Sequence, residues 1–207
     1  MSVGLILASA SPRRRALLAR LGLPFEIVPS DVLEALPLGV PPARLAEGMA
    51  RAKARDVAVR VGTRGEPPVV VLGADTLVIL EDQALGKPTS REEGRAMLAA
   101  LRGRTHEVVT AVALVEAPAG REATASVMSR VVMRPYTDGE IEAYLDTGEP
   151  NDKAGAYAVQ GEGGRLVARV EGCYTNVVGL PLRTTARLLR AFGLPAVEPP
   201  EAPGPFQ

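Results

Sequence analysis

The sequence predicts a mixed α/β fold, and three observations support this prediction. Short apolar stretches rich in β-branched residues alternate with longer stretches whose apolar residues recur at helical spacing. Two long apolar stretches in the second half are joined by Pro118-Ala119-Gly120, which is typical of an antiparallel pair. The chain has 207 residues, of which 46% are hydrophobic, enough for one sizeable core. We therefore expect one domain over residues 1–193 and a disordered Pro- and Glu-rich tail over 194–207.

The first half of the chain begins with a buried strand and a capped helix. Ser11 stands where an N-cap belongs, Pro12 where a first helical residue belongs, and Gly22 closes the helix. A second, longer helix has an amphipathic pattern, and the apolar stretch after it is interrupted by Gly73-Ala74-Asp75-Thr76. The strands expected in this half are 3–8, 25–28, 69–72 and 77–80, and the helices are 12–21 and 42–61.

The second half has its own start and stop signals. Ser90 followed by Glu93 predicts a capping box at the start of a helix, and Thr137 or Asp138 caps the next helix. Gly161-Glu162-Gly163-Gly164 is expected to turn between two strands of a hairpin. The strands expected here are 107–115, 125–133, 157–160 and 166–170, and the helices, with their caps, are 90–101, 137–146 and 181–192.

Composition excludes several classes of function. The formal net charge is zero and only 3% of residues are aromatic, which disfavours a nucleic-acid-binding surface. Cys173 and His106 are the lone cysteine and histidine, so neither an intrachain disulfide nor a zinc site of Cys and His can form. We expect packing for Cys173 and a structural role for His106. The chain shows no signal peptide and no apolar stretch of membrane-spanning length, so we expect a soluble, cytoplasmic protein without a membrane partner.

The segment Ser9-Ala10-Ser11-Pro12-Arg13-Arg14 is a candidate polyanion site. It joins the first strand to the first helix, whose N-terminus offers backbone N–H groups and a partial positive charge. The guanidiniums of Arg13 and Arg14 suit phosphate oxygens because each planar fork can donate two bonds at once. The alternative is a solvated basic helix start.

Lysine is rare in this chain, and its three positions are distinctive. The chain has 24 basic residues, of which Lys53, Lys87 and Lys153 alone are lysines. Three lysines retained against such a preference for arginine point to places where a compact ammonium is needed, although chance alone could leave three.

Asp75 is the best candidate for a catalytic carboxylate. It follows a stretch apolar enough to be buried on both faces, and ligand sites in open α/β sheets lie outside strand ends. Asp31 and Glu34, in the loop after the second strand, could complete an oxygen-only metal site with Asp75, for which Mg²⁺ or Mn²⁺ is the expected ion. Turn formation with Thr76, and solvated loop acids, are the alternatives. Cations, carboxylates and a metal together are what cleavage of a phosphoanhydride needs.

The chain resembles the Maf family, the septum-formation-inhibitor-like nucleoside triphosphate pyrophosphatases, over about residues 3–192. The segments that carry the resemblance are Leu7-Ala8-Ser9-Ala10-Ser11-Pro12-Arg13-Arg14, Leu72-Gly73-Ala74-Asp75-Thr76, Gly86-Lys87-Pro88, Gly103-Arg104-Thr105-His106, Asp152-Lys153-Ala154-Gly155-Ala156-Tyr157, Gln160-Gly161 and Asn176-Val177-Val178-Gly179-Leu180-Pro181-Leu182. The resemblance implies an elongated, mixed sheet with flanking helices and two lobes around a cleft, similar to the inosine triphosphatase fold, in a homodimer.

The resemblance also implies an activity and roles for single residues. It implies hydrolysis of a nucleoside triphosphate to the monophosphate and pyrophosphate with a divalent metal, in a house-cleaning role. Asp75 would accept the proton and, with Glu34, hold the metal. The expected substrate-binding residues are Ser9, Arg13, Arg14, Lys53, Thr76, Lys87 and Gln160.

Residues after the catalytic position indicate a branch of the family. Thr76, Lys153 and Gln160 resemble the branch that acts on dTTP and UTP rather than 7-methyl-GTP. The Gln160 amide could pair with the O4 and N3 edge of uracil or thymine. Two alternatives remain open at this point: modified pyrimidine nucleotides as substrates, and a nucleotide-sensing inhibitor of septum formation that has little turnover.

Overall fold

The computed structural model describes residues 4–33, 39–62 and 68–199, which fold around one mixed sheet. In this part of the chain the strands are β1 (Gly4–Leu7), β2 (Glu26–Ile27), β3 (Val69–Leu80), β4 (Gln83–Leu85), β5 (Thr105–Ala117), β6 (Glu122–Met133) and β7 (Val167–Glu171). Their order is β2-β1-β3-β5-β6-β7, with β4 paired to β3. The β2-β1-β3 pairings are parallel and the others are antiparallel, which confirms the predicted mixed α/β class.

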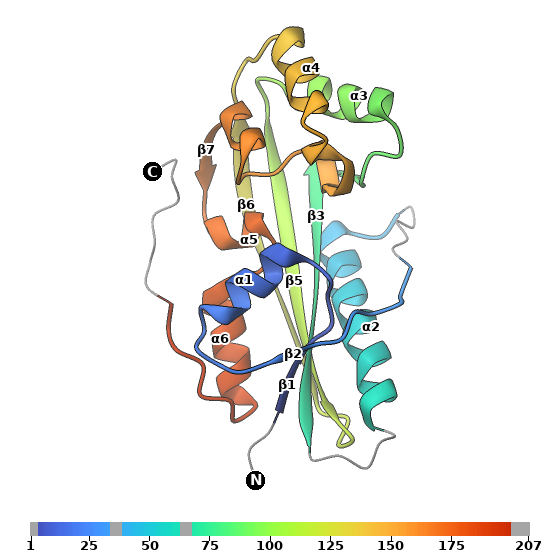
Figure 1. The fold of residues 1–207 in the computed structure, drawn as a ribbon, viewed down its shortest axis with the longest axis vertical. Helices are drawn as coiled ribbons and strands as arrows, with labels where there is room; N and C mark the ends of the chain where they lie inside the picture. Colours follow the sequence, from blue (N-terminus) through green and yellow to red (C-terminus); the bar gives the residue numbers. More distant parts are fainter. Residues whose placement is uncertain (1–3, 34–38, 63–67, 200–207) are drawn as a thin grey trace.

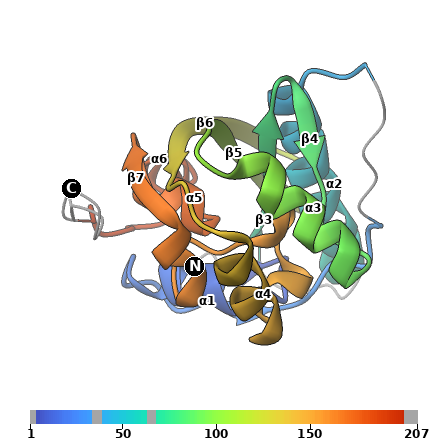
Figure 2. The ribbon, with the colours of Figure 1, turned by 90° about the horizontal axis from the view of Figure 1, so that it is seen from above.

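Helices cover both faces of the sheet. They are α1 (Pro12–Ala19), α2 (Pro42–Gly62), α3 (Arg91–Leu101), α4 (Asp138–Asp146), α5 (Tyr174–Val178) and α6 (Leu182–Ala191), with 3-10 turns η1 (Glu149–Asp152), η2 (Ala154–Ala156) and η3 (Glu162–Leu166). Figure 1 shows β3, β5 and β6 running along the length of an elongated molecule, with α2 on one side and α1 and α6 on the other. Figure 2 shows the sheet curling around the helices at one end.

Two separate cores lie on the two faces of β3. Because side chains alternate along a strand, Val71, Leu77 and Ile79 face α2, whereas Val70 and Leu72 face the core that contains α1 and α6. The α2 face is built largely from alanines and valines of the helix. Small residues let the helix approach the sheet closely.

Gly73 marks the closest approach of α2 to β3. A Cβ atom built on Gly73 would lie 2.2 Å from the backbone oxygen of Ala50 and 2.7 Å from the nitrogen of Ala54. Both contacts are to backbone, so no side-chain rotation relieves them. A glycine is therefore required wherever α2 keeps this position on β3.

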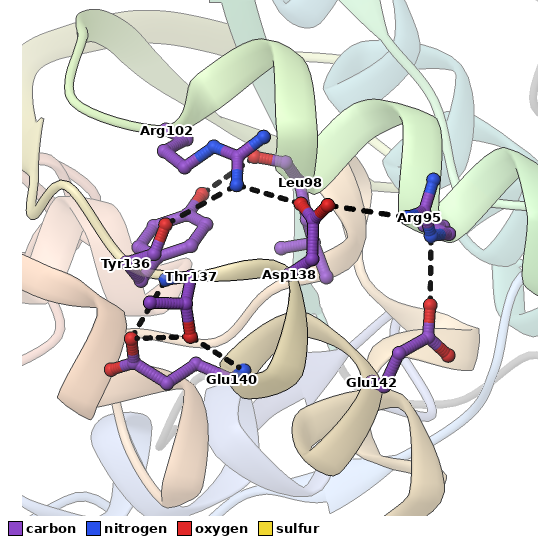
Figure 3. Close-up of polar contacts among 8 residues, drawn as sticks. All are labelled: Arg95, Leu98, Arg102, Tyr136, Thr137, Asp138, Glu140 and Glu142. Carbon is purple, nitrogen blue, oxygen red and sulfur yellow. Dashed lines mark hydrogen bonds and ion pairs between the residues drawn. The ribbon is translucent and has the colours of Figure 1, made fainter.

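Ion pairs join α3 to α4. Arg95 lies between Asp138 and Glu142, and Arg102 donates to Asp138 at 2.7 Å, as Figure 3 shows. Solvent screens these charges, so the pairs contribute little to stability. The Tyr136 hydroxyl donates a buried hydrogen bond of 2.6 Å to the Leu98 carbonyl, which connects the segment before α4 to α3.

Most predicted elements are present, and four expectations need correction. The apolar stretches 69–72 and 77–80 are a single strand, β3, because Gly73 to Thr76 continue its pairing with β5. The expected hairpin over 157–170 does not form: the segment before Gly161 is not a strand, the glycines lie in η3, and β7 pairs with β6 instead. The Glu149 carboxylate accepts backbone N–H bonds from Glu162 and Gly163, which holds this segment in a turn.

The other two corrections concern a cap and the tail. Ser90 caps α3 by accepting from the Glu93 nitrogen, but the Glu93 carboxylate binds the backbone and hydroxyl of Thr89, so the capping box is not closed. Residues 194–199, which we expect from the sequence to be part of a disordered tail, instead pack against the domain, with Leu194 and Ala196 buried. Residues 200–207 lie outside the described part of the chain. Among the described helices, none has both the length and the apolar character that a membrane span requires.

His106 lies in the core, as its predicted structural role requires. Its Nε2 atom is 2.7 Å from the Tyr157 hydroxyl, and its Nδ1 atom has no hydrogen-bond partner among the described residues. The side chain is 2% exposed, and this burial lowers the pKa of His106 from 6.5 to about 4. The imidazole is therefore neutral at pH 7.

We expect Gly73→Ala to lower the free energy of unfolding by about 2 kcal/mol or more, because α2 must move away from β3. Urea denaturation measures this change. The matched control is Gly48→Ala on α2, where an added Cβ meets no atom within 4 Å, so this variant should be as stable as the wild type or slightly more stable. Equal stability of the two variants would contradict the close packing at Gly73.

We expect His106→Asn to make the protein less sensitive to acid. In the unfolded chain histidine binds a proton below pH 6.5, whereas folded His106 does so only below about pH 4. Its contribution to stability is thus fully present above pH 6.5 and is lost as the pH falls toward 4. The free energy of unfolding, measured by urea denaturation, should fall between pH 7 and pH 4.5 by about 2–3 kcal/mol more in the wild type than in His106→Asn. An equal fall in the free energy of unfolding of the two proteins would contradict this role of His106.

Candidate active site

A cleft lies where β3 has no neighbouring strand on one edge. On this edge β1 pairs with β3 as far as Leu72, and β4 pairs with it from Val78 onward. Across residues 73–77 no strand of the described chain pairs with this edge. A cleft of about 700 Å³ opens there. It is lined by the β1–α1 loop, α2 and β3 on one side and by residues 85–87 and 152–160 on the other.

This position corrects the expectation that Asp75 follows the end of its own strand. Asp75 lies within β3, and the strand that ends beside it is β1. The β1–α1 turn contributes Ser9 to Arg14 to the cleft, so the general location of ligand sites at strand ends still holds, but through β1.

Asp75 is paired with Lys53 on the α2 face of β3. Lys53 Nζ lies 2.7 Å from Asp75 Oδ1, and the side chains are only 8% and 7% exposed. Their contact depends on the close packing of α2 at Gly73. A buried ion pair adds little net stability, because desolvation offsets the attraction, although removing one partner costs about 3–5 kcal/mol. A requirement of packing alone would be met as well by apolar residues, so the pair indicates a functional centre.

Arg14 is held on the other side of β3. Its Nε donates to the Gly179 carbonyl at 3.0 Å, its Nη2 to the Thr76 hydroxyl at 3.0 Å, and its Nη1 to the Ser9 hydroxyl at 3.4 Å. The predicted cap is present: the Ser11 hydroxyl accepts from the Arg14 nitrogen, and Pro12 begins α1. The guanidinium therefore has a fixed place beside the helix start.

Behind Thr76 lies a buried polar network. The hydroxyls of Thr76 and Thr110 are 2.9 Å apart, and Thr110 Oγ1 donates to the Asn176 carbonyl at 2.8 Å. The Asn176 amide in turn accepts from the Thr110 nitrogen and donates to the Val108 carbonyl, both at 2.9 Å. Thr110 and Asn176 are both 0% exposed.

Two further lysines and Arg13 also line the cleft. Lys87 and Lys153 lie on two loops that are tied together by a bond from the Gly155 nitrogen to the Gly86 carbonyl, at 3.0 Å. Lys153 also pairs with Asp152. Burial alone would raise the pKa of Asp152, but the bond from Lys153 and the charges of Lys153 and Arg13 outweigh it, so that pKa lies below its usual value.

Gln160 is exposed at the edge of the cleft, near α5. Its side chain hydrogen-bonds Tyr174, and this bond partly opposes the rise in the pKa of Tyr174 that burial causes.

The cleft brings together the described residues that the sequence predicts to act in catalysis or to bind the substrate. These residues are Ser9, Arg13, Arg14, Lys53, Asp75, Thr76, Lys87 and Gln160, and the third lysine, Lys153, joins them. Glu34 lies outside the described residues. Asp31 is described but does not line the cleft: its carboxylate pairs with Arg60 at 3.2 Å and its backbone nitrogen donates to Asp56 at 3.0 Å, so the structure does not bring Asp31 to Asp75 as expected. Sequence reasoning missed Thr110, whose signal was a hydroxyl in the middle of an apolar strand. It also gave no role to Asn176, a polar residue among apolar ones.

Asp75 offers the cleft an oxygen ligand of the kind that magnesium and manganese prefer. No group of three His, Cys, Asp or Glu side chains suited to a metal is found within the described ranges. Magnesium commonly uses only one or two carboxylates and completes its shell with waters and substrate phosphates. The residues present therefore fit an ion that is bound jointly with an anionic ligand, rather than one held by the protein alone.

Comparison with known proteins places the chain among close relatives. A dTTP/UTP pyrophosphatase of Moorella thermoacetica is 54% identical over 92% of this chain and 95% of its own length. Enzymes of the same name from Desulforamulus reducens and Acetivibrio thermocellus are 47% and 46% identical, each over 93% of this chain and 98% and 96% of their own. A solved nucleoside-triphosphatase / dITP/XTP pyrophosphatase from Mycobacterium abscessus matches more distantly, with a TM-score of 0.42 and 19% identity over 65% of this chain and 76% of that chain.

The family model described as Maf-like protein matches residues 4–192, which include every described residue of the cleft. With this match and relatives that are about half identical over nearly the whole chain, the protein belongs to the Maf family.

Proposed function

We propose that this protein hydrolyses dTTP and UTP to the nucleoside monophosphate and pyrophosphate. The names of its relatives support these substrates, and the charge of the cleft supports a polyphosphate ligand. Among the described lining residues there are five cations, Arg13, Arg14, Lys53, Lys87 and Lys153, against two carboxylates, Asp75 and Asp152. Such an excess of positive charge offsets the charge of a triphosphate.

The observation that carries the proposal is the buried pair of Lys53 and Asp75. It puts one carboxylate out of bulk water, within a cleft lined by cations, at a fixed distance of 2.7 Å from an ammonium. A carboxylate placed in this way can orient a water molecule and accept its proton. Lys53 keeps the carboxylate in place before the reaction and offsets negative charge during it.

Hydrolysis breaks the anhydride bond between the α- and β-phosphates and adds the elements of water across it. In the proposed reaction Asp75 takes one proton of the attacking water, the water oxygen joins phosphorus, and the anhydride oxygen leaves with the other product. Arg14, Lys87 and Lys153 approach the cleft from different elements, so they can bind different phosphate oxygens and hold the triphosphate in position for the reaction.

A divalent metal belongs to the same proposal. Asp75 would hold it together with phosphate oxygens of the substrate, and Glu34 is the further ligand that the sequence predicts. When bound, the ion polarises a phosphoryl oxygen and lowers the pKa of bound water. A homodimer is proposed on the family resemblance. A cytoplasmic location is proposed on the single cysteine and the sequence of the N-terminal segment, and the zero net charge supports the absence of a nucleic-acid partner.

We expect Asp75→Asn to lower kcat for dTTP by about 100-fold or more, because the amide cannot accept the proton. Pyrophosphate and monophosphate release are measured with Mg²⁺ or Mn²⁺ over a panel of dTTP, UTP, modified pyrimidine nucleotides, dCTP and GTP, with a chelator as the metal-free reference. Asp138→Asn, which removes an exposed ion-paired carboxylate on α4, is the matched control and should keep full activity. Binding of dTTP by the wild type without release of pyrophosphate would contradict the proposed enzymatic activity and favour a nucleotide sensor.

We expect Lys53→Met to lower kcat by about 10- to 100-fold, and the double variant with Asp75→Asn to be no more than about threefold worse than Asp75→Asn alone. Groups that act as a unit are non-additive, because removing either one already removes their joint effect. The cycle is measured as kcat at saturating dTTP. Multiplicative losses in the double variant would show that the two side chains act independently.

A further inference from the structure

The hydrogen bonds behind Thr76 leave only one arrangement of protons. A carbonyl oxygen can only accept, so the bond of 2.8 Å between Thr110 Oγ1 and the Asn176 carbonyl uses the single proton of the Thr110 hydroxyl. In the 2.9 Å contact between the two threonines, Thr110 must then accept and Thr76 must donate. The proton of Thr76 therefore points into the protein, away from the cleft.

This arrangement makes Thr76 an acceptor for Arg14. With its proton directed to Thr110, the Thr76 oxygen presents lone pairs, and Arg14 Nη2 donates to it at 3.0 Å. A hydroxyl without the Thr110 partner could also direct its proton elsewhere in the cleft and rotate among several orientations. The buried network restricts Thr76 to the orientation in which its lone pairs face Arg14.

Asn176 holds Thr110 from two sides, and its own orientation is settled. Its Oδ1 accepts from the Thr110 nitrogen, which can only donate, and its Nδ2 donates to the Val108 carbonyl, which can only accept. Nδ2 also donates to Ser129 Oγ at 2.9 Å, and the Ser129 hydroxyl in turn donates to the Cys173 backbone carbonyl. The amide cannot flip without breaking these bonds.

We propose that Thr110 and Asn176 are positioning residues that fix Thr76 as a hydrogen-bond acceptor and so hold the Arg14 guanidinium in place for the phosphate chain. Neither residue lines the cleft, and both act through Thr76. The inference rests on the proposed function in one respect only: that the ligand of Arg14 is a phosphate.

The test compares Thr110→Val with a matched buried threonine. Valine keeps the shape and the strand preference of threonine but loses the hydroxyl. Thr185 on α6 is also 0% exposed, and its hydroxyl donates to the Pro181 carbonyl at 2.9 Å, away from the cleft, so Thr185→Val loses an equally buried hydroxyl. Thr110→Ser, which restores a hydroxyl, is the rescue. Thr110→Ala replaces the valine variant if that protein is insoluble.

The readouts are calorimetric binding of inorganic pyrophosphate and the kinetics of dTTP hydrolysis. We expect Thr110→Val to weaken pyrophosphate binding and raise KM about tenfold while kcat stays within about threefold, with Thr110→Ser and Thr185→Val near the wild type. Unchanged binding in Thr110→Val, an equal loss in Thr185→Val, or no rescue by serine would overturn the inference. Failure of the wild type to hydrolyse any nucleotide would instead overturn the proposed function, and pyrophosphate binding would still decide the role of Thr110.

Discussion

The close packing of α2 against β3 is the contact on which the rest of the site depends. Gly73 lets the helix backbone come within reach of the strand, and two residues further along the strand Asp75 points to the same face. Lys53, one turn along α2 from the contact at Ala50, then meets Asp75 with no room for water between them. If the helix lay further out, the ammonium and the carboxylate would both be solvated. The chemistry of the cleft is therefore set by a packing distance.

Neighbouring positions on β3 serve two different environments. Asp75 faces α2 and its lysine, whereas Thr76 faces α1, α5 and the buried threonine–asparagine network. A strand edge without a neighbour lets one ligand reach both. The pair on one face is charged, and the network on the other face has only neutral groups whose orientation is settled. This division explains why the cleft can combine an ionised centre with a rigid cation.

Much of this arrangement could be predicted from the sequence, and the remainder follows from contacts between distant residues. Local signals placed α1, α2, α3 and α4, because caps such as Ser11 and Thr137 act over a few residues. The rarity of lysine singled out Lys53, and sequence motifs singled out Asp75 and Thr76. The break expected in β3 was wrong because pairing with β5 outweighs the local preference of Gly73. The hairpin at Gly161 was wrong because Glu149, a residue outside that segment, binds its backbone. Neither partner is visible in a local window.

The short free edge of β3 also bears on whether a strand of another molecule can pair with this chain. Unpaired strand edges invite pairing with another chain and can lead to aggregation. Here the free stretch is confined between β1 and β4 and spans residues 73–77, about 17 Å at the usual rise per residue. An incoming strand would find few partners there, and it would have to bury the charged groups around Asp75. The opening beside Asp75 is thus too short and too polar to accept a second β-strand.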